Sequence, residues 1–466
     1  MKTTGLFALA MVLTAGFCAR ATAADAVDVG GRLELFVDDF LVESLLGDAT
    51  LHMHRPEPRE VVLTTDQPWE GNTCAYYTIF RDGDLYRMYY RGSHYNTQTK
   101  KAAHPEVTCY AESSDGVHWE KPNLGLFEFN GSKQNNIVWD GIGTHCFVVF
   151  KDGNPACPPE ARYKGISRGR PRGKKGLYLF QSPDGIHWKL IQDKPAITEG
   201  AFDSQNLAFW DPRAGLYREY HRTFTNGVRS IMTGTSEDYV HWSKPVLLEH
   251  GDAPNEHLYT NAVRLYERAP HIFLGFPTRY LPKEGQRVEP VLMTSRDGLH
   301  FKRWSEPLIP EDAPEDRKGN RSNYMTWGMV QLPGNAREYS VYATEAYYTG
   351  PDTRVRRFVY RVDGFVSVRA EEGGELLSKP LTFSGKALRV NYKTTGNGRL
   401  RAELQDTSSK AIDGYSLADC KPLRGDAISQ VVGWTNGTDV SALAGQPIRV
   451  RFVLEGGDLY SMTFGE

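Results

Sequence analysis

One short motif recurs along this chain, and its spacing constrains the fold more than any other feature. The copies are SSDGVHW (113–119), SPDGIHW (182–188), SEDYVHW (236–242) and SRDGLHF (295–301), with a weaker copy, RVDGFVSV, at 361–368. Successive aspartates of the motif lie 69, 54, 59 and 66 residues apart. A period of about 60 residues accommodates one four-stranded sheet in each repeat. The spacing therefore predicts five equivalent sheets.

The residues around each copy indicate where the motif lies within its sheet. An alternating apolar strand precedes each copy, and a second strand pair lies upstream, for instance at 76–92, 206–222 and 261–279. Asp-Gly between two strands favours a type I′ hairpin, in which both central residues have positive φ. We expect the aspartate to cap this turn and the tryptophan to pack between sheets. The motif histidines occupy equivalent outer positions and cannot converge on one ligand, so we interpret them as structural.

Sheets repeated in this way predict an all-β fold, a five-bladed β-propeller over residues 24–370. The segment 33–62 is expected to supply the strand that closes the ring. From residue 371 the repeat stops, and alternating apolar and polar residues over 371–466 predict a β-sandwich. This region has few aromatic residues able to stack on a sugar, and Trp434 is the main one. We therefore expect it to cover the propeller and not to bind carbohydrate independently.

The first 23 residues have the pattern of a signal peptide. Lys2 precedes an apolar run at 5–17, and Ala21-Thr22-Ala23 forms a small-x-small cleavage site. We therefore expect a secreted or periplasmic protein that is not membrane-bound after cleavage, since no later stretch approaches the ~20 apolar residues of a bilayer span. The formal net charge of −2 gives no electrostatic reason to bind nucleic acid. The sequence does not specify an oligomeric state.

Carboxylates stand near the predicted starts of three innermost strands, where propellers place their ligand sites. They are Glu70, Asp203 and Glu256. Like charges held close together raise one another's pKa, as needed to keep one carboxyl protonated beside an ionised one. Such a pair is the machinery of glycoside hydrolysis. The candidate catalytic residues are therefore Glu70 as base or nucleophile, Asp203 as a positioning and pKa-tuning group, and Glu256 as general acid.

Other side chains near these strand starts are suited to sugar hydroxyls and ring stacking, and a carbohydrate is the predicted partner. The candidate substrate-binding residues are His145, His257, Arg279, Arg321, Asn323, Trp327 and Glu345. Structural ion pairs between blades are an equally open explanation for the charged members. No cofactor or metal site is predicted, although a channel ion such as calcium stays an open alternative. The basic run at 167–175 is interpreted as solvated, but facing the channel mouth it would favour sulfated or uronic substrates.

The blades, the S-x-D-G-x-H-W turn and the trailing sandwich resemble the five-bladed propeller glycoside hydrolases of families 32, 43, 62 and 68. Residue by residue, the resemblance carries the families' first carboxylate, orienting aspartate and general acid onto Glu70, Asp203 and Glu256. The family-32 motif N-D-P-N-G is absent, which argues against fructan as the substrate. Two alternatives stay open: a non-catalytic sugar-binding or scaffold propeller, and a propeller lyase or phosphorylase that uses a Tyr/His base or a phosphate-binding cluster.

Overall fold

Strands dominate the secondary structure, and the prediction of an all-β chain is confirmed. The structure, a computed structural model, describes residues 26–310 and 323–466. The predicted signal peptide and Arg321 lie outside these residues. No helix between residues 26 and 310 or 323 and 466 has the length and hydropathy to span a bilayer. The helices described are three-residue 3₁₀ turns: η2 (Thr144–Cys146), η3 (Pro159–Ala161), η4 (Pro171–Gly173) and η5 (Ser441–Leu443).

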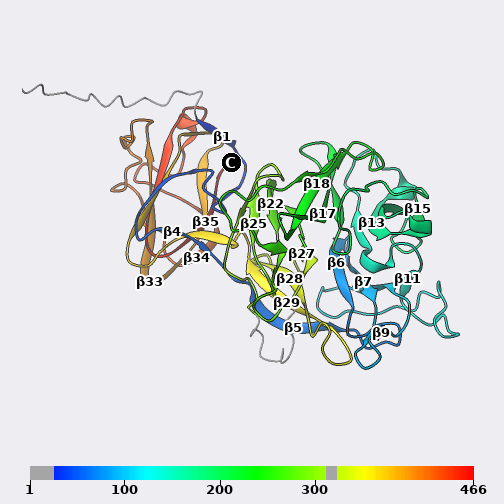
Figure 1. The fold of residues 1–466 in the computed structure, drawn as a ribbon. Coiled ribbons are helices and arrows are strands. Elements are labelled where there is room, and N and C mark those ends of the chain that lie inside the picture. Colours follow the sequence, from blue (N-terminus) through cyan, green and yellow to red (C-terminus); the bar gives the residue numbers. More distant parts are fainter. Residues whose placement is uncertain (1–25, 311–322) are drawn as a thin grey trace, which may run out of the picture.

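A four-stranded antiparallel order recurs through the larger of the two bodies in Figure 1, which spans residues 57–365. In four of these runs each strand pairs with the next strand of its run along the chain. The runs are β6 (Ala75–Asp82), β7 (Leu85–Gly92), β10 (Val107–Ser113) and β11 (Ile137–Trp139); β12 (Val148–Lys151), β13 (Tyr163–Gly169), β14 (Gly176–Ser182) and β15 (Lys189–Leu190); β16 (Leu207–Asp211), β17 (Leu216–Thr225), β18 (Val228–Ser236) and β19 (Val246–Leu247); and β21 (Arg264–Tyr266), β22 (Ala269–Gly275), β25 (Met293–Ser295) and β26 (Phe301–Arg303).

A further run is completed by a strand from far upstream. It contains β27 (Met325–Val330), β28 (Glu338–Glu345), β29 (Arg354–Arg361) and β5 (Glu57–Thr64), and β5 pairs with β29. A segment ahead of the first run thus completes the last one, as expected from the sequence. Strand β27 also pairs in parallel with β6 through Trp327 and Thr78, which joins the two runs at a seam.

Two smaller sheets extend from the larger body. They are the hairpin β8 (Tyr95–Asn96) and β9 (Lys101–Ala102), and the three strands β20 (His257–Leu258), β23 (Thr278–Leu281) and β24 (Arg287–Pro290).

The four full copies of the motif lie between the third and fourth strands of a run, as predicted, but their turns are not type I′. The weak copy at 361–368 was predicted to do the same, and that prediction is wrong: it connects β29 to β30 (Val366–Ala370), which pairs with β35 (Arg449–Gly465) and β4 (Thr50–Met53) of the smaller body. Gly116, Gly185 and Gly298 have positive φ, whereas the aspartates before them do not. The aspartate instead acts through its side chain: Asp184 Oδ1 accepts hydrogen bonds from the backbone N–H groups of Ile186 and His187. A side-chain cap of this kind replaces the second positive-φ residue.

The motif tryptophans pack between runs, as predicted. The Trp188 ring meets Phe147 of its own run edge-on at 5.1 Å and Tyr89 of the preceding run at 6.2 Å. Trp119 likewise meets Tyr342 of β28 at 6.4 Å. The motif histidine His118 is largely exposed and lies 2.7 Å from its own Asp115. These positions agree with a structural role for the motif.

The smaller body combines both ends of the described chain (Figure 1). Its C-terminal strands pair with β1–β4, so residues 27–53 belong here and not to the larger body where the predicted boundary at residue 24 put them. Trp434 is fully buried and donates to the Ala402 carbonyl, so it cannot stack on a sugar. The strands are β1 (Val27–Gly30), β2 (Glu34–Leu35), β3 (Val42–Gly47), β4 (Thr50–Met53), β30 (Val366–Ala370), β31 (Gly374–Ser378), β32 (Leu381–Phe383), β33 (Ala387–Gln405), β34 (Asp426–Val431) and β35 (Arg449–Gly465).

A buried ion-pair cluster joins the two bodies. Glu34, on β2, is 1% exposed and contacts Arg296 at 2.7 Å and His271 at 3.2 Å, and both partners belong to the larger body. Arg296 also binds Asp38 at 2.8 Å. Burial alone would raise the pKa of Glu34, but the contacts with His271 and Arg296 lower it to about 2. Glu34 is therefore ionised at neutral pH and holds the bodies together.

Candidate functional site

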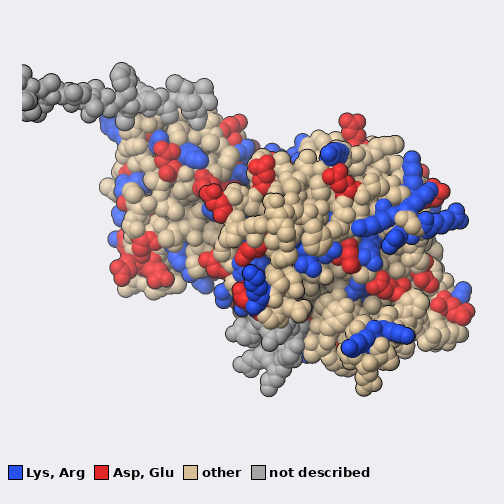
Figure 2. Space-filling model, viewed as in Figure 1, with Lys and Arg blue, Asp and Glu red and all other residues tan. Residues whose placement is uncertain are grey.

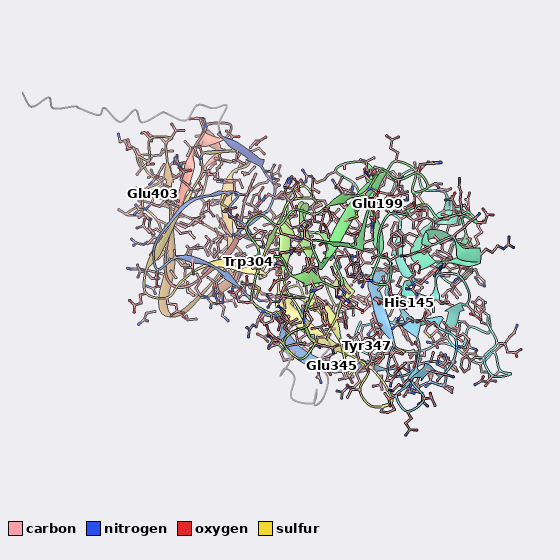
Figure 3. All side chains as sticks on the ribbon, viewed as in Figure 1. His145, Glu199, Trp304, Glu345, Tyr347 and Glu403 are labelled. Atoms are coloured by element: carbon pink, nitrogen blue, oxygen red, sulfur yellow. The ribbon has the colours of Figure 1, made fainter. Side chains whose placement is uncertain are left out.

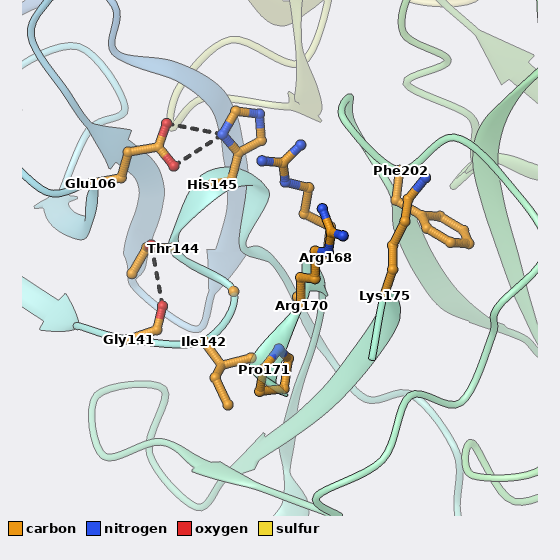
Figure 4. A pocket seen from close by; sticks show the side chains of 12 residues that line it. Glu106, Gly141, Ile142, Thr144, His145, Arg168, Arg170, Pro171, Lys175 and Phe202 are labelled. Carbon is orange, nitrogen blue, oxygen red and sulfur yellow. Dashed lines mark hydrogen bonds and ion pairs between the residues drawn. The ribbon is translucent and has the colours of Figure 1, made fainter. Parts of the chain in front are cut away.

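A cavity of about 530 Å³ opens beside the first two strand runs of the larger body (Figure 4). Its wall comes from the loop before β10, the segment around η2, the hairpin between β13 and β14, and the loop before β16. The charged and aromatic side chains that line it are Glu106, His145, Arg168, Arg170, Lys175 and Phe202. Figure 3 labels His145 and Tyr347 in this body, away from Glu403 in the smaller one.

His145 is held between two carboxylates. Its Nδ1 lies 2.9 Å from Glu106 Oε1, and its Nε2 lies 2.7 Å from Asp203 Oδ1. A protonated imidazole can donate to both carboxylates at once. The segment that carries His145 is held in place at Gly143. This residue adopts φ 97°, and its carbonyl accepts a hydrogen bond from the Ser167 hydroxyl. The ring also packs against Tyr76, with centroids 5.5 Å apart.

Arg91 is a buried cation that lies next to His145 and Glu106. Its side chain is almost fully buried and lies 3.5 Å from Glu106 Oε1. Its Nη2 donates to the Thr73 carbonyl at 2.6 Å and to the Tyr347 hydroxyl at 3.0 Å, and its guanidinium lies over the Tyr76 ring at 5.1 Å. These contacts hold one cation in place beside Glu106.

Asp203 is the accessible carboxylate of the cluster, with 61% of its side chain exposed. The hydrogen bond from His145 is the largest influence on it, and the charges of His145, Arg168 and Arg222 add to that, so the pKa of Asp203 lies well below its usual range. Arg168 Nη1 approaches Asp203 Oδ1 to 2.8 Å. For Glu106, burial acts to raise the pKa, but the His145 hydrogen bond and the charges of His145, Arg91 and Arg168 lower it on balance. Both carboxylates are ionised at neutral pH and suit the stabilisation of positive charge, and the lowered pKa makes each a weaker base than an ordinary carboxylate.

Tyrosines line the neighbouring hollow, where inner strands β6 and β27 begin. Tyr76 has φ 58°, at a bulge of β6 that turns its ring out of the ladder. Tyr259 and Tyr324 have ring centroids 5.7 Å apart, and Tyr324 and Tyr347 5.6 Å apart. Arg222 lies over the Tyr259 ring at 5.3 Å. These rings pack edge to face on one another, and the hollow of about 20 Å³ has room for little more than a water molecule.

The structure does not place Glu70 at the cavity, which corrects the prediction that it contacts substrate. Its side chain is fully buried and lies 2.7 Å from Lys121 Nζ. Tyr90 donates its hydroxyl to Glu70 Oε1 at 2.5 Å, and the Gln67 N–H donates to Oε2 at 3.1 Å. Because these partners occupy both oxygens, Glu70 serves as the centre of a buried polar cluster.

The Glu256 carboxylate likewise forms ion pairs within the fold. It lies 3.0 Å from Arg303 and 3.4 Å from Arg279, and Arg279 also binds the buried Glu289. Because Arg303 and Arg279 both bind the Glu256 carboxylate, its oxygens are engaged in a structural ion-pair cluster and not at the cavity. The three predicted carboxylates therefore sit in three separate ion-pair clusters, and only Asp203 is beside the cavity.

The predicted substrate-binding residues also separate in the structure. His145 lines the cavity, whereas His257 accepts the Arg229 N–H at 3.1 Å and packs against Tyr280. The others are engaged inside the fold: Arg279 in the Glu256–Glu289 cluster, Asn323 as a donor to the Thr344 carbonyl, Trp327 as a donor to the Val263 carbonyl, and Glu345 in a buried ion pair with Arg356.

Three residues of the site were missed from the sequence: Glu106, Arg91 and Arg168. They come from second and third strands or the loops beside them, whereas the search considered only the starts of innermost strands. Arg168 had a usable signal, because it lies in the basic run at 167–175, which does reach the cavity.

Within the described residues, no group of three or more His, Cys, Asp or Glu side chains is arranged to hold a metal ion. The five cysteines of this part of the chain are all free thiols: Cys74, Cys109, Cys146, Cys157 and Cys420.

No family model matches the sequence. Two curated relatives are uncharacterized proteins of Mycobacterium tuberculosis, MT1551 of strain CDC 1551 / Oshkosh and Rv1502 of strain ATCC 25618 / H37Rv. Each is 32% identical over 123 residues, which is 26% of this chain and 34% of the relative. The chain thus spans about a third of the length of the relatives that it matches.

Solved structures similar to the chain include a thermostable family-43 glycoside hydrolase, with 16% identity, a TM-score of 0.46, and 67% of this chain and 96% of that one covered. A β-1,2-mannobiose phosphorylase from Listeria innocua has 12% identity, a TM-score of 0.46, and coverage of 67% and 97%. An N-acetylgalactosamine deacetylase from F. plautii has 13% identity, a TM-score of 0.45, and coverage of 68% and 96%. The neighbours thus include a glycoside hydrolase of family 43, one of the families that the sequence resembles.

Proposed function

We propose that this protein is an exported glycoside hydrolase that cleaves a poly- or oligosaccharide in the cavity beside His145. The observation that carries the proposal is Asp203, an exposed and ionised carboxylate held by His145 and Arg168 at the cavity wall. Residues 1–23 are proposed to direct export, as their sequence pattern indicates.

We also propose that the larger body is a five-bladed propeller and that the smaller body is a β-sandwich. Five four-stranded runs, the seam between β27 and β6, and the completion of the last run by β5 support the blade count. In this arrangement the cavity and the tyrosine-lined hollow lie near the starts of the innermost strands, where propellers usually bind ligands.

The proposed chemistry uses Asp203 as the base. Asp203 takes a proton from water as the water oxygen attacks the anomeric carbon and the glycosidic C–O bond breaks. The departing oxygen takes its proton from solvent water, because His145 lies 2.7 Å from Asp203, on the same side of the sugar as the base, and serves to hold that carboxylate in place. Glu106, which is itself paired with Arg91, holds the His145 ring from the other side, and Tyr76 packs against it.

A second candidate is β-elimination on a uronic acid sugar. It is favoured by one observation: neither Glu106 nor Asp203 has the raised pKa of a carboxylic acid kept ready to donate a proton. His145 and Arg168 are instead the residue types that would remove a carbon-bound proton and neutralise the sugar carboxylate. In that reaction the C–H electron pair forms the new C=C bond, and the C–O bond to the leaving sugar breaks as its oxygen takes up a proton.

The test is a screen of purified protein against aryl glycosides and polysaccharides, with Asp203→Asn alongside. We expect kcat to fall by about 10²- to 10⁴-fold in Asp203→Asn, the range for loss of a general base. Glu199→Gln is the matched control, because Glu199 is an exposed carboxylate four residues earlier in the same loop and does not line the cavity.

The products separate the candidates. New reducing ends without ultraviolet absorbance indicate hydrolysis, and an absorbing unsaturated product indicates elimination. Sugar binding without turnover by wild type would refute both reactions and leave the non-catalytic binding protein.

A further inference from the structure

We propose that the cavity selects a saccharide bearing an anionic substituent, a sulfate ester or a carboxylate, through Arg170 and Lys175 beside Arg168. This inference rests on the proposed function, since it names the substrate class of the same site. The cations reach the cavity from the hairpin between β13 and β14, and Figure 4 shows Lys175 beside Phe202, across the cavity from Glu106.

The charge balance of the cavity wall is the first argument. Three cations, Arg168, Arg170 and Lys175, line it against one carboxylate, Glu106. Asp203 adds a second negative charge next to the wall, but Arg168 already lies 2.8 Å from it, and Glu106 is already paired with His145 and Arg91. The carboxylates of the site are therefore paired with His145, Arg91 and Arg168, and not with Arg170 or Lys175.

The second argument is what surrounds the two remaining cations. Among the described residues, no carboxylate lies within 4.0 Å of Arg170 or Lys175. Lys175 Nζ instead lies 6.0 Å from the centroid of the Phe202 ring at the cavity wall. Figure 2 shows Lys and Arg side chains gathered on the surface where Figure 1 places β13 and β15. Like charges gathered around a cavity repel one another, and a bound anion would relieve that repulsion.

The hairpin is anchored at its base, so the cations are presented from a defined place. The Tyr178 hydroxyl donates to the Lys174 carbonyl at 2.9 Å. A Cβ on Gly169 would lie 2.7 Å from both Ile142 and Tyr178, which shows how closely the hairpin packs on the cavity wall. Between the two cavity cations the chain turns through Arg172 and Gly173, both with positive φ, and neither Arg172 nor Lys174 lines the cavity.

Because the same loop carries two cations that line the cavity and two that do not, it supplies a matched pair of double variants. The double variant Arg170→Gln/Lys175→Gln removes the two cavity cations, and Arg172→Gln/Lys174→Gln removes two exposed cations of the same loop that do not line the cavity. Both variants change the net charge equally, so a difference between them reports position and not overall charge.

Binding is measured by titration calorimetry at two salt concentrations with two ligand pairs. One pair is oligogalacturonate and its methyl ester, and the other is a sulfated galactan oligosaccharide and its desulfated form. We expect wild type to prefer one charged member, with affinity that falls as salt rises. The cavity double variant should lose about tenfold in that affinity, the scale for two solvent-exposed charge contacts, and the control variant should lose less than about twofold.

Each outcome decides the inference. Preference for the sulfated or the uronic ligand identifies which anion is recognised, and both support the proposal. Equal binding of charged and neutral ligands, or an equal loss in the two double variants, would overturn it. The proposed function fails separately: selective anion binding without any turnover leaves this inference intact, whereas turnover of neutral sugars with no charge preference removes it and keeps the hydrolase.

Discussion

Replacing Glu70 by glutamine tests whether this carboxylate is structural, as its burial indicates, or catalytic, as its place in the sequence suggested. The Glu70 side chain is fully buried and accepts hydrogen bonds from Lys121, Tyr90 and Gln67. Burial acts to lower the pKa of Lys121, but Glu70 and Asp66 raise it on balance, so Lys121 is charged at neutral pH. Glutamine keeps the shape of the side chain and removes the charge opposite Lys121.

The expected cost follows from the burial of this pair. Removing one partner of a buried ion pair destabilises by about 3 to 5 kcal/mol. Lys121 keeps Asp66 at 3.0 Å, a partner with 57% of its side chain exposed, so the lower end applies. Unfolding entropy is about 2.1 cal/mol/K per residue, which gives ~0.6 kcal/mol/K for a body of roughly 300 residues and a fall in melting temperature of about 5 °C.

The assay combines differential scanning calorimetry with kcat on whichever substrate the screen identifies. We expect Glu70→Gln to melt earlier and keep kcat within about twofold of wild type. Asp203→Asn should show the reverse, because an exposed carboxylate contributes little to stability. If Glu70→Gln melts like wild type and loses activity by two orders of magnitude or more, the assignment of Glu70 to a structural cluster is wrong.

Three further predictions concern stability. Because the pKa of Glu34 falls from 4.5 to about 2 on folding, its contribution is fully present above pH 4.5 and is lost as pH falls toward 2. That contribution is worth roughly 3 kcal/mol, of which about 2 kcal/mol is lost between pH 6 and pH 3. Glu34→Gln should therefore narrow the stability difference between these two pH values by that amount in denaturant titrations; an unchanged difference would contradict the ion pair with Arg296. Gly328→Ala at the β27–β6 seam puts a Cβ 2.5 Å from the Ile79 carbonyl, and we expect a loss of about 1 to 3 kcal/mol in urea unfolding, whereas Gly373→Ala, with open space around it, should be neutral. Asp184→Ala removes two caps of the motif turn and should cost about 1 to 2 kcal/mol by the same measurement, with kcat unchanged because the turn does not line the cavity; a larger effect on kcat than on stability would argue against a purely structural motif.

The repeat was predictable because its information is local. Alternating apolar residues specify strands, and the S-x-D-G-x-H-W turn specifies where two strands meet, whatever lies elsewhere in the chain. The side-chain capping by Asp184 also depends on residues within three positions. The turn type was predicted wrongly because the same Asp-Gly pair serves both a type I′ hairpin and a side-chain cap.

The site was predictable only in part, because the same residue type has opposite roles in different surroundings. Asp203 and His145 were both named from the sequence, and the structure brings them to 2.7 Å. In the sequence, Glu70 looked equivalent to Asp203. In the structure its role is decided by Lys121, which is 51 residues away and binds the Glu70 carboxylate inside the fold. Glu106 was missed because it precedes a third strand and not an innermost one.

The sequence by itself determined an all-β chain with a repeated four-stranded unit, because strand periodicity and turn chemistry are properties of neighbouring residues. Tertiary structure decided the rest. It paired residues 27–53 with strands that lie more than 300 positions later, buried Glu70 and left Asp203 exposed, and turned the basic run toward a cavity. Those outcomes depend on which distant surfaces and charges meet, and no local pattern encodes that meeting.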